Sequence, residues 1–417
     1  MPKTTIEIAV NDLRKSLPDI AWNACEDSFF AVWSAAPGME SDSAAYSIAG
    51  RKISSDGTLL EAPVDILTTE DILMLPRIVY NPNKNQFLVI YCRAESYFNI
   101  RGIILDADGR AAGDHFIVTD APASQFHYTA AFNSRRNQYL ITYNDVRDGV
   151  SSAYGVIIDD AGAVVKPEFL VCGAEGHQVN PVVCYNPADD TYLVNWEDFR
   201  AHGNSLESLG TLEVMTDIYG ALLSGDGTII VGDIPMCADA VGRNADQRFN
   251  GITWNSKKNE FLASWTDTRE HIRNVAIMGR IVGADGSMSA GDHALVDAPG
   301  AQMISHIHYV PAEDAYFACF ERDKNDVDKF YFKDISAKLD IGAQWLDGKG
   351  RPAGGIIGIC SEAGNQRFVR CAHSEKSGSF LLVWQSDFPG VSDSVEGHIM
   401  SAGGNIMGAI YKSSVLK

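Results

Sequence analysis

The chain has 417 residues, a hydrophobic fraction of 46% and a formal net charge of −20. The apolar content is enough for a large core and excludes a chain that is disordered throughout. The negative charge disfavours nucleic acid and anionic membranes as partners. No apolar run approaches the ~20 residues of a membrane-spanning helix. The segment Met1 to Val10 lacks the apolar core of a signal peptide, so we expect an intracellular protein unless a leader was removed.

The eight cysteines are spread along the chain without any Cys-x-x-Cys pair. Several lie in apolar stretches, which predicts buried thiols rather than a zinc site. His306 and His308 would share one face of a strand and could form a metal pair, but two ligands fall short of a metal centre. We therefore expect no cofactor, with a structural metal ion as the open alternative.

Taken in chain order, one sequence phrase recurs seven times. Its core is an apolar pentad that ends in an aromatic residue, at 29–33, 87–91, 139–143, 192–196, 261–265, 316–320 and 380–384. Eleven residues before each pentad ends stands another large residue: Trp22, Tyr80, Phe132, Tyr185, Trp254, Tyr309 and His373. The intervening segments, such as Asn81-Pro-Asn-Lys-Asn85, have the composition of hairpin turns. Each copy therefore predicts two strands joined by a tight turn.

A second hairpin is predicted after each pentad, where a glycine, an apolar stretch and another glycine follow. The pairs are Gly50/Gly57, Gly102/Gly109, Gly155/Gly162, Gly220/Gly227, Gly279/Gly286, Gly342/Gly350 and Gly397/Gly404. The second glycine often follows an aspartate, which suits a turn that needs positive φ. Each repeat should then hold four strands, consistent with its many β-branched and aromatic residues.

Seven such units predict an all-β fold, a seven-bladed β-propeller with four-stranded antiparallel blades. One sheet of this kind cannot bury both faces alone, whereas seven arranged radially can, and closure removes long exposed edges. An open solenoid is the alternative, but neither end shows a polar capping repeat. We expect a single domain over 1–417, and Ile6 to Val10 could complete the last blade. The blades are expected at about 11–70, 71–123, 124–176, 177–242, 243–300, 301–364 and 365–417.

Three consecutive repeats carry Asp-x-Arg just after the pentad, with the arginines at Arg147, Arg200 and Arg269. In a propeller these loops share one mouth with the start of each blade, a concave junction of the kind that ligands favour. Together with Arg248, the arginines could bind carboxylate or sulfate groups in one sector of that mouth. In the alternative interpretation, each aspartate caps its turn and pairs with its arginine or with the next blade.

Histidines form the second group of candidates. His127 starts the third repeat beside Tyr128 and aligns with Asn180 of the fourth, and His177 lies just before Asn180. A lone histidine is more often structural, but His127 adjoins the arginine sector and is the preferred candidate. The long segment from Ala201 to Asp217 is expected to form either a flap over the mouth or a passive surface insertion.

The amino-acid sequence of the fourth repeat shows a family resemblance. It reads Tyr-Leu-Val-x-Trp-x-Asp over 192–198 and Asp-Ile-Tyr-Gly-x-Leu-Leu-x-x-Asp-Gly over 217–227. This phrase, repeated over essentially the whole chain, resembles seven-bladed propellers that include ulvan lyases, rhamnosyl-glucuronate lyases and related rhamnosidases. The resemblance rests on the repeat, which is scaffold and says little about activity.

The resemblance implies a polysaccharide or oligosaccharide lyase that cleaves a uronate-containing glycan by β-elimination. Arg147 or Arg200 would neutralise the uronate carboxylate, and His127 would remove the proton at C5. Three side chains are candidates to protonate the leaving oxygen: Tyr143, Tyr128 and His177. Three more would contact the substrate: Asn180, Arg248 and Arg269. The expected protein is a monomer whose partner is an acidic oligosaccharide or polysaccharide.

Two other function classes stay open. A non-catalytic propeller that binds glycan or protein would show aromatic platforms and equivalent sites in every blade, whereas here histidine and arginine gather in blades three to five. A glycosidase on the same scaffold would use carboxylates at a pocket. Glu197 and Asp198 are the residues that support the glycosidase alternative.

Overall fold

The computed structural model describes residues 5–11, 13–37, 45–201, 216–238, 245–269, 274–323, 339–387 and 403–412. Every regular element in these ranges is a β-strand, and the predicted all-β class is confirmed. No helix within the described ranges is long and apolar enough to cross a membrane. By internal contacts the chain forms two units, one of 1–120, 335–342 and 358–417, the other of 121–334 and 343–357.

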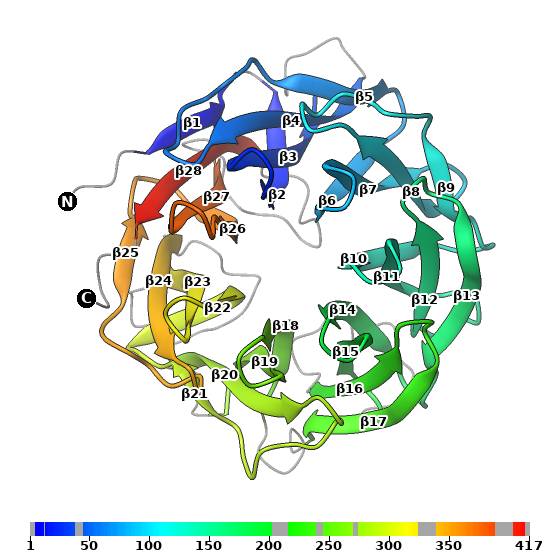
Figure 1. Cartoon of the computed structure of the whole chain (residues 1–417), viewed down its shortest axis with the longest axis vertical. Coiled ribbons are helices and arrows are strands. Elements are labelled where there is room, and N and C mark those ends of the chain that lie inside the picture. The colour runs from blue at the N-terminus through cyan, green and yellow to red at the C-terminus, as the bar shows by residue number, and fades with distance from the viewer. Residues whose placement is uncertain are drawn as a thin grey trace. The chain divides into compact units, whose positions relative to one another are not determined.

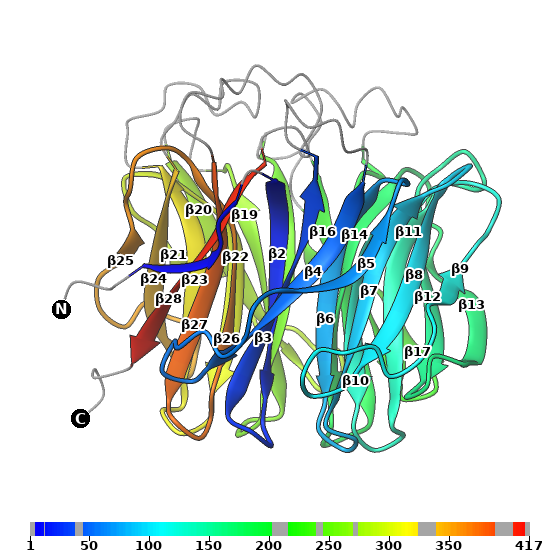
Figure 2. The same cartoon turned by 90° about the horizontal axis from the view of Figure 1, so that it is seen from above.

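The first unit contains two antiparallel arrangements. One is a four-stranded sheet with the strands in chain order, shown side by side in Figure 2: β6 (Leu73–Asn81), β7 (Gln86–Ala94), β8 (Phe98–Leu105) and β9 (Phe116–Thr119). The other joins two sequence-distant groups into one eight-stranded sheet. Its strands are β2 (Arg14–Asn23), β3 (Ser28–Ala36), β4 (Tyr46–Ser54), β5 (Val64–Thr69), β26 (Gln366–His373), β27 (Ser379–Asp387), β28 (Gly404–Lys412) and β1 (Ile6–Ala9).

The second unit repeats the four-stranded pattern, as Figure 1 shows for β10 to β13. Its first sheet has β10 (Gln125–Asn133), β11 (Gln138–Asp145), β12 (Ser152–Asp159) and β13 (Val164–Cys172). Its second has β14 (Gln178–Asn186), β15 (Thr191–Asp198), β16 (Asp217–Ser224) and β17 (Ile229–Cys237). The remaining strands of this part share one sheet. They are β18 (Gln247–Asn255), β19 (Glu260–Asp267), β20 (Asn274–Gly283), β21 (His293–Val296), β22 (Gly300–Val310), β23 (Ala315–Asp323), β24 (Leu339–Asp347) and β25 (Ile357–Cys360), of which β24 and β25 contain residues of both units.

The N-terminal strand completes the C-terminal group of strands, as predicted. β1 pairs antiparallel with β28, with Ile6 opposite Gly408. Ile8 is fully buried in the same core as Val383 and Ile406. This pairing adds a fourth strand to β26, β27 and β28, so the last repeat takes its final strand from the other end of the chain.

The glycines of the repeat have two distinct roles. The second glycine of six pairs has positive φ, between 74° and 94°, as predicted for the turn. The first glycines Gly102, Gly155, Gly220 and Gly279 make room for a side chain of the fourth strand: a Cβ at Gly102 would lie 2.4 Å from the Phe116 ring. In the last repeat the expected pair Gly397/Gly404 is wrong. Gly408 occupies the equivalent position, because it pairs with Val383 as Gly50 pairs with Val32, and Gly397 lies outside the described residues.

The large residue before each first turn has a specific partner. Tyr185 donates a hydrogen bond from its hydroxyl to Asp190, five residues later, at 3.1 Å. The same bond joins Trp22 to Asp27, Tyr80 to Asn85, Trp254 to Asn259 and Tyr309 to Asp314. Each acceptor has positive φ, which aspartate and asparagine tolerate better than most residues. The repeated aromatic therefore fixes the hairpin as well as the core.

The first strand of each repeat contains a bulge, and two of these bulges position the candidate site. The register shifts between Val179 and Val182 in β14, and at the equivalent place in the six other first strands. Six bulges begin with a residue of positive φ other than glycine: Leu17, Leu75, His127, Asn180, Phe249 and Phe368. A bulge leaves the extra residue unpaired and re-aims its side chain. Of these six side chains, only those of His127 and Asn180 are polar.

Packed hydrophobic cores, without disulfides, hold the sheets together. None of the eight cysteines forms a disulfide, and six of them are buried, in agreement with the prediction. The pentads supply most of the fully buried aromatic side chains, including Trp196 and Trp265. In the second unit, Trp196 packs with Tyr192 and Leu223 between neighbouring sheets.

Candidate active site

The bulges of β14 and β18 bring polar groups to one buried carboxyl. Glu197 lies on β15 opposite Val179, the residue that precedes the β14 bulge. Asn180 Nδ2 donates to its Oε1 at 2.8 Å, from the same sheet. The backbone N–H of Phe249, in the β18 bulge, donates to the same oxygen at 2.8 Å. The unpaired N–H that the second bulge creates is thus satisfied by a side chain of the neighbouring sheet.

Glu197 is only 3% exposed. Burial raises the pKa of its carboxyl, and the hydrogen bonds and the charge of Arg248 oppose this only in part. The N–H groups of Asn180 and Phe249 both donate to Oε1 rather than to Oε2. An oxygen that accepts two N–H groups is a poor place for a proton. When the carboxyl is neutral, Oε2 is therefore the more favourable oxygen for its proton.

A second carboxyl, that of Asp246, lies at the start of β18. Its Oδ2 forms a 2.6 Å ion pair with Arg248 Nε, and its Oδ1 accepts a 2.7 Å hydrogen bond from Thr216 Oγ1. Burial raises the pKa of Asp246 above its ordinary value, and the charge of Arg248 and the hydrogen bonds from Thr216 oppose this only in part. Asp246 also contributes to the raised pKa of Glu197, so the two carboxyls interact. About a fifth of the Asp246 side chain remains exposed.

The arrangement combines two interacting carboxyls of different exposure with one cation. Burial raises the pKa of both carboxyls, but Glu197 is the more enclosed of the two, while Asp246 is more exposed and is paired with an arginine. Pairs of titratable groups in environments of this contrast are the usual sources of an acid and a base in one site. The arrangement could therefore donate a proton from Glu197 and accept one at Asp246.

The three arginines of the Asp-x-Arg segments are engaged by carboxylates of their own sheets. Arg147 contacts Asp145 at 2.6 Å and Glu168, on β13, at 2.9 Å. Its guanidinium also lies 4.5 Å from the centre of the Tyr154 ring. The aspartate caps the turn as well, because Asp145 Oδ1 accepts the backbone N–H of Arg147 at 2.7 Å.

The same arrangement repeats in the next two sheets. Arg200 contacts Asp198 and Asp233, at 2.8 and 2.9 Å. Arg269 contacts Asp267 and Asp292, at 2.6 and 2.5 Å. We call these three groups the arginine latches, because each ties the end of a second strand to the fourth strand or the segment before it. The structure thus contains the pairing that the alternative interpretation predicts, and a role of these arginines in substrate binding stays a prediction.

The remaining predicted site residues differ widely in exposure. His127 is half-buried in the β10 bulge, with its ring 5.0 Å from that of Phe126. Tyr128 is buried beside it, and Tyr143 is fully buried and stacked on Tyr154. His177 is also fully buried, and its Nδ1 accepts the backbone N–H of Ser151 at 3.0 Å. Only Asn180 and Arg248 are grouped around one carboxyl, that of Glu197.

His306 and His308 lie on β22 as predicted. Their rings are 4.8 Å apart and nearly perpendicular. This contact is an edge-to-face pair, and it supplies two of the ligands that a metal site would need. Metal binding there stays a prediction. Of the predicted flap, residues 202–215 lie outside the described residues.

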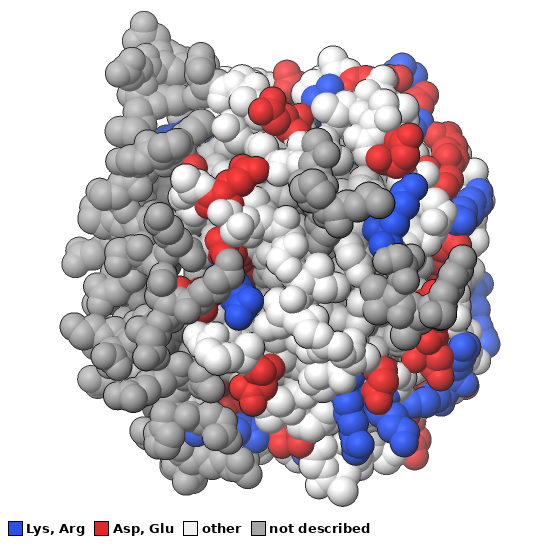
Figure 3. Space-filling view, turned by 90° about the vertical axis from the view of Figure 1, so that its left-hand side faces the viewer, with Lys and Arg blue, Asp and Glu red and all other residues white. Residues whose placement is uncertain are grey.

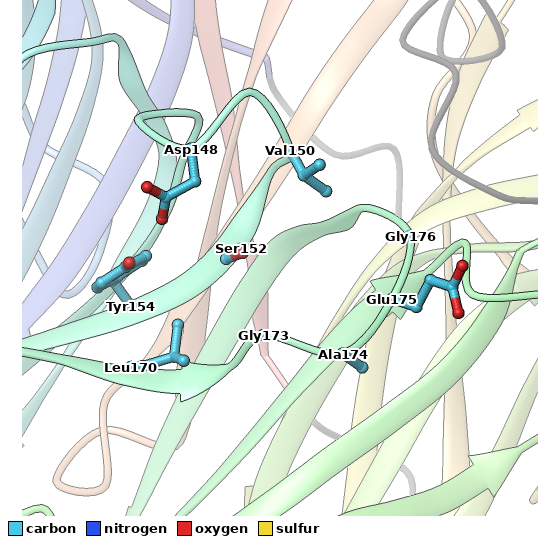
Figure 4. A pocket seen from close by; sticks show the side chains of 9 residues that line it. All are labelled: Asp148, Val150, Ser152, Tyr154, Leu170, Gly173, Ala174, Glu175 and Gly176. Atoms are coloured by element: carbon cyan, nitrogen blue, oxygen red, sulfur yellow. The ribbon is translucent and has the colours of Figure 1, made fainter.

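A shallow pocket of about 270 Å³ opens at the edge of the β10–β13 sheet. Figure 4 shows Asp148, Tyr154 and Leu170 at one end and Glu175 at the other, with Ser152 between them. Its lining contains carboxylates and no basic side chain.

Sequence reasoning missed Asp246. The signal was present, since Asp246 and Arg248 have the same Asp-x-Arg spacing as the latches. It stands before a first strand rather than after a second one, and only the structure shows that its charge and that of Arg248 act on Glu197.

Comparisons with known proteins bear on the fold alone. No family model and no curated protein sequence matches the chain. The chain is similar to the crystal structure of a protein of unknown function from Dyadobacter fermentans, with a TM-score of 0.57 and 11% identity over 98% of both chains. It is also similar to a Hadza microbial sialidase, with a TM-score of 0.51 and 11% identity over 97% of this chain and 66% of that chain.

An α-L-arabinofuranosidase from Lactobacillus brevis matches more distantly, with a TM-score of 0.40 and 10% identity. That match covers 67% of this chain and 94% of the other. At such identities a shared fold says nothing about a shared reaction.

Proposed function

We propose that the chain is a seven-bladed β-propeller that hydrolyses glycosidic bonds by general acid catalysis, with Glu197 as the acid. The seven blades would be the seven groups of four strands, one of them completed by β1. The seven sequence repeats and the pairing of β1 with β28 support this arrangement. That a structure of similar fold is named a sialidase is consistent with the carbohydrate class.

One observation carries the proposal: Glu197 is enclosed, has a raised pKa and directs both N–H donors to Oε1. Its Oε2 proton would pass to the glycosidic oxygen while the bond between that oxygen and the anomeric carbon breaks. Water would then add to the anomeric carbon and lose a proton to Asp246. Two carboxyl groups in these roles are the usual requirement for glycoside hydrolysis.

The β-elimination reaction implied by the family resemblance is the second candidate. It is supported by His127, whose bulge position is equivalent to that of Asn180. The two reactions leave different products, since elimination creates an unsaturated sugar that absorbs ultraviolet light and hydrolysis does not.

The test is product analysis on a panel of neutral and acidic glycans with the wild-type chain and Glu197→Gln. New reducing ends without new ultraviolet absorbance, lost in Glu197→Gln, are the expected result. Unsaturated products that persist in Glu197→Gln and vanish in His127→Ala would replace the hydrolase with the lyase.

A further inference from the structure

We infer that the glycan bound beside Glu197 is uncharged, and that Asp246 is the residue that excludes acidic sugars. This inference rests on the proposed function and adds the class of substrate. It follows from how the described residues neutralise every arginine of the predicted basic sector.

None of the three arginine latches carries a net positive charge. Each guanidinium faces two carboxylates, one at the end of the second strand and one from the fourth strand or the segment before it. Each latch therefore has a net charge of −1 when all three groups are ionised. Asp145, Asp198 and Asp267 have fully buried side chains, so water cannot displace them from their arginines. Binding an anionic sugar here would require breaking a buried ion pair, which is strongly unfavourable.

The charge of Arg248 acts on the proposed acid, and Arg248 too is paired with a carboxylate. Its Nε contacts Asp246 at 2.6 Å, and its charge acts on Glu197. A uronate carboxylate brought to Arg248 would meet Asp246 as a like charge, which disfavours binding. The hydroxyl groups of a neutral sugar carry no such penalty, and carboxylate and amide groups accept and donate the hydrogen bonds that they need.

The surroundings give no compensating positive potential. The pocket at the edge of the β10–β13 sheet is lined by Asp148 and Glu175 without a basic residue. Figure 3 shows the side of the molecule that lies on the left in Figure 1, and there too basic side chains are interspersed with acidic ones. The whole chain carries a formal net charge of −20. Long-range attraction therefore favours neutral over anionic glycans.

Asp246→Asn gives a sharp test, because it removes the negative charge beside Arg248 while keeping the size of the side chain. Binding would be measured by calorimetry on full-length protein that also carries Glu197→Gln, so that no probe is cleaved. The neutral probes are xylotriose and cellotriose, and the acidic probes are trigalacturonate and sialyllactose. Asp148→Asn is the matched control, since it removes one exposed carboxylate outside the Glu197 group.

We expect Asp246→Asn to strengthen trigalacturonate binding by about tenfold, the size of one charge-assisted hydrogen bond, and Asp148→Asn to change it less than twofold. The inference would be overturned if the protein with native Asp246 and Glu197→Gln bound an acidic probe at least as tightly as it binds the neutral probes. An unchanged affinity in Asp246→Asn would overturn it as well. Hydrolysis of an acidic glycan that depends on Glu197 would refute the substrate class alone, whereas glycan hydrolysis unaffected by Glu197→Gln would refute the proposed function.

Discussion

Asn180 and Glu197 are joined by a 2.8 Å hydrogen bond from Nδ2 to Oε1 within one sheet. The bond exists because the β14 bulge gives Asn180 a positive φ of 53° and turns its amide toward β15. Glu197 is thereby held with one oxygen occupied and the other available. The account of this protein depends on that orientation, since it decides which oxygen can carry a proton.

The pH dependence of stability should report the raised pKa of Glu197. In the folded chain burial favours the neutral carboxyl, so the folded pKa lies above the unfolded one. This contribution to stability is complete below the ordinary pKa of glutamate and is lost as the pH rises through the raised value. Glu197→Gln keeps an acceptor for Asn180 and Phe249 and does not titrate. Thermal unfolding should therefore show that the stability of Glu197→Gln relative to wild type increases as the pH rises. A difference in stability that does not change with pH would contradict the raised pKa of Glu197.

Asn144 tests whether the residue opposite the start of a bulge needs a polar partner, as Glu197 has. It lies on β11 opposite Phe126, as Glu197 lies opposite Val179. It is fully buried, and neither amide atom has a hydrogen-bond partner in the described part of the chain. Because an unpaired buried amide is costly, Asn144→Leu should raise the free energy of unfolding by about 1 kcal/mol. Cys92→Leu, at the same register position in β7, lacks that benefit and should lower it. Chemical denaturation measures both, and a destabilised Asn144→Leu would mean that the amide has a bound partner.

The arginine latches should matter for stability. Asp198→Ala leaves Arg200 without its buried partner and should lower the free energy of unfolding by about 3 kcal/mol. Arg110→Ala, which removes an exposed contact with Asp108 at 3.2 Å, should cost less than about 1 kcal/mol. Urea denaturation compares the two. If Asp198→Ala proves neutral to stability, Arg200 is freer than its contacts indicate, and the predicted role in anion binding regains support.

β1 should be required for the stability of the group formed by β26, β27 and β28. Ile8 is fully buried against Val383 and Ile406, so Ile8→Ala should lower the free energy of unfolding by about 2–4 kcal/mol. Val10, half exposed just beyond β1, provides the control, and Val10→Ala should change stability by less than about 0.5 kcal/mol. Equal effects of the two substitutions would argue against β1 as a structural strand.

The sequence predicted the strands better than it predicted the site, for physical reasons. Strand pairs follow from local patterns, and the seven pentads lie on strands as expected. The partner of the repeated aromatic, such as Asp190 for Tyr185, is five residues away and could have been found by the same inspection. The bulges could not, because leucine and phenylalanine at Leu17, Leu75 and Phe249 give no sequence signal for positive φ.

The candidate site depends on those bulges and on contacts between sheets. The sequence marked Asn180, Arg248 and Glu197 separately, but only the register brings them together. The latches show the converse, because Asp145 and Arg147 are adjacent in sequence and their pairing was foreseen as an alternative. Glu168, the third member, lies on the fourth strand, and its contact depends on the register shifts between β12 and β13.

The most direct test of Glu197 as the acid compares two leaving groups on one sugar that wild type hydrolyses. A sugar or alkyl leaving group needs a proton as the bond breaks, whereas a dinitrophenyl group does not. For Glu197→Gln, kcat/KM should fall by roughly 100-fold or more on the first and by less than about threefold on the second. Glu321→Gln, at the equivalent register position in β23, should show neither loss. Equal losses of Glu197→Gln on both leaving groups, or no loss on either, would contradict the account.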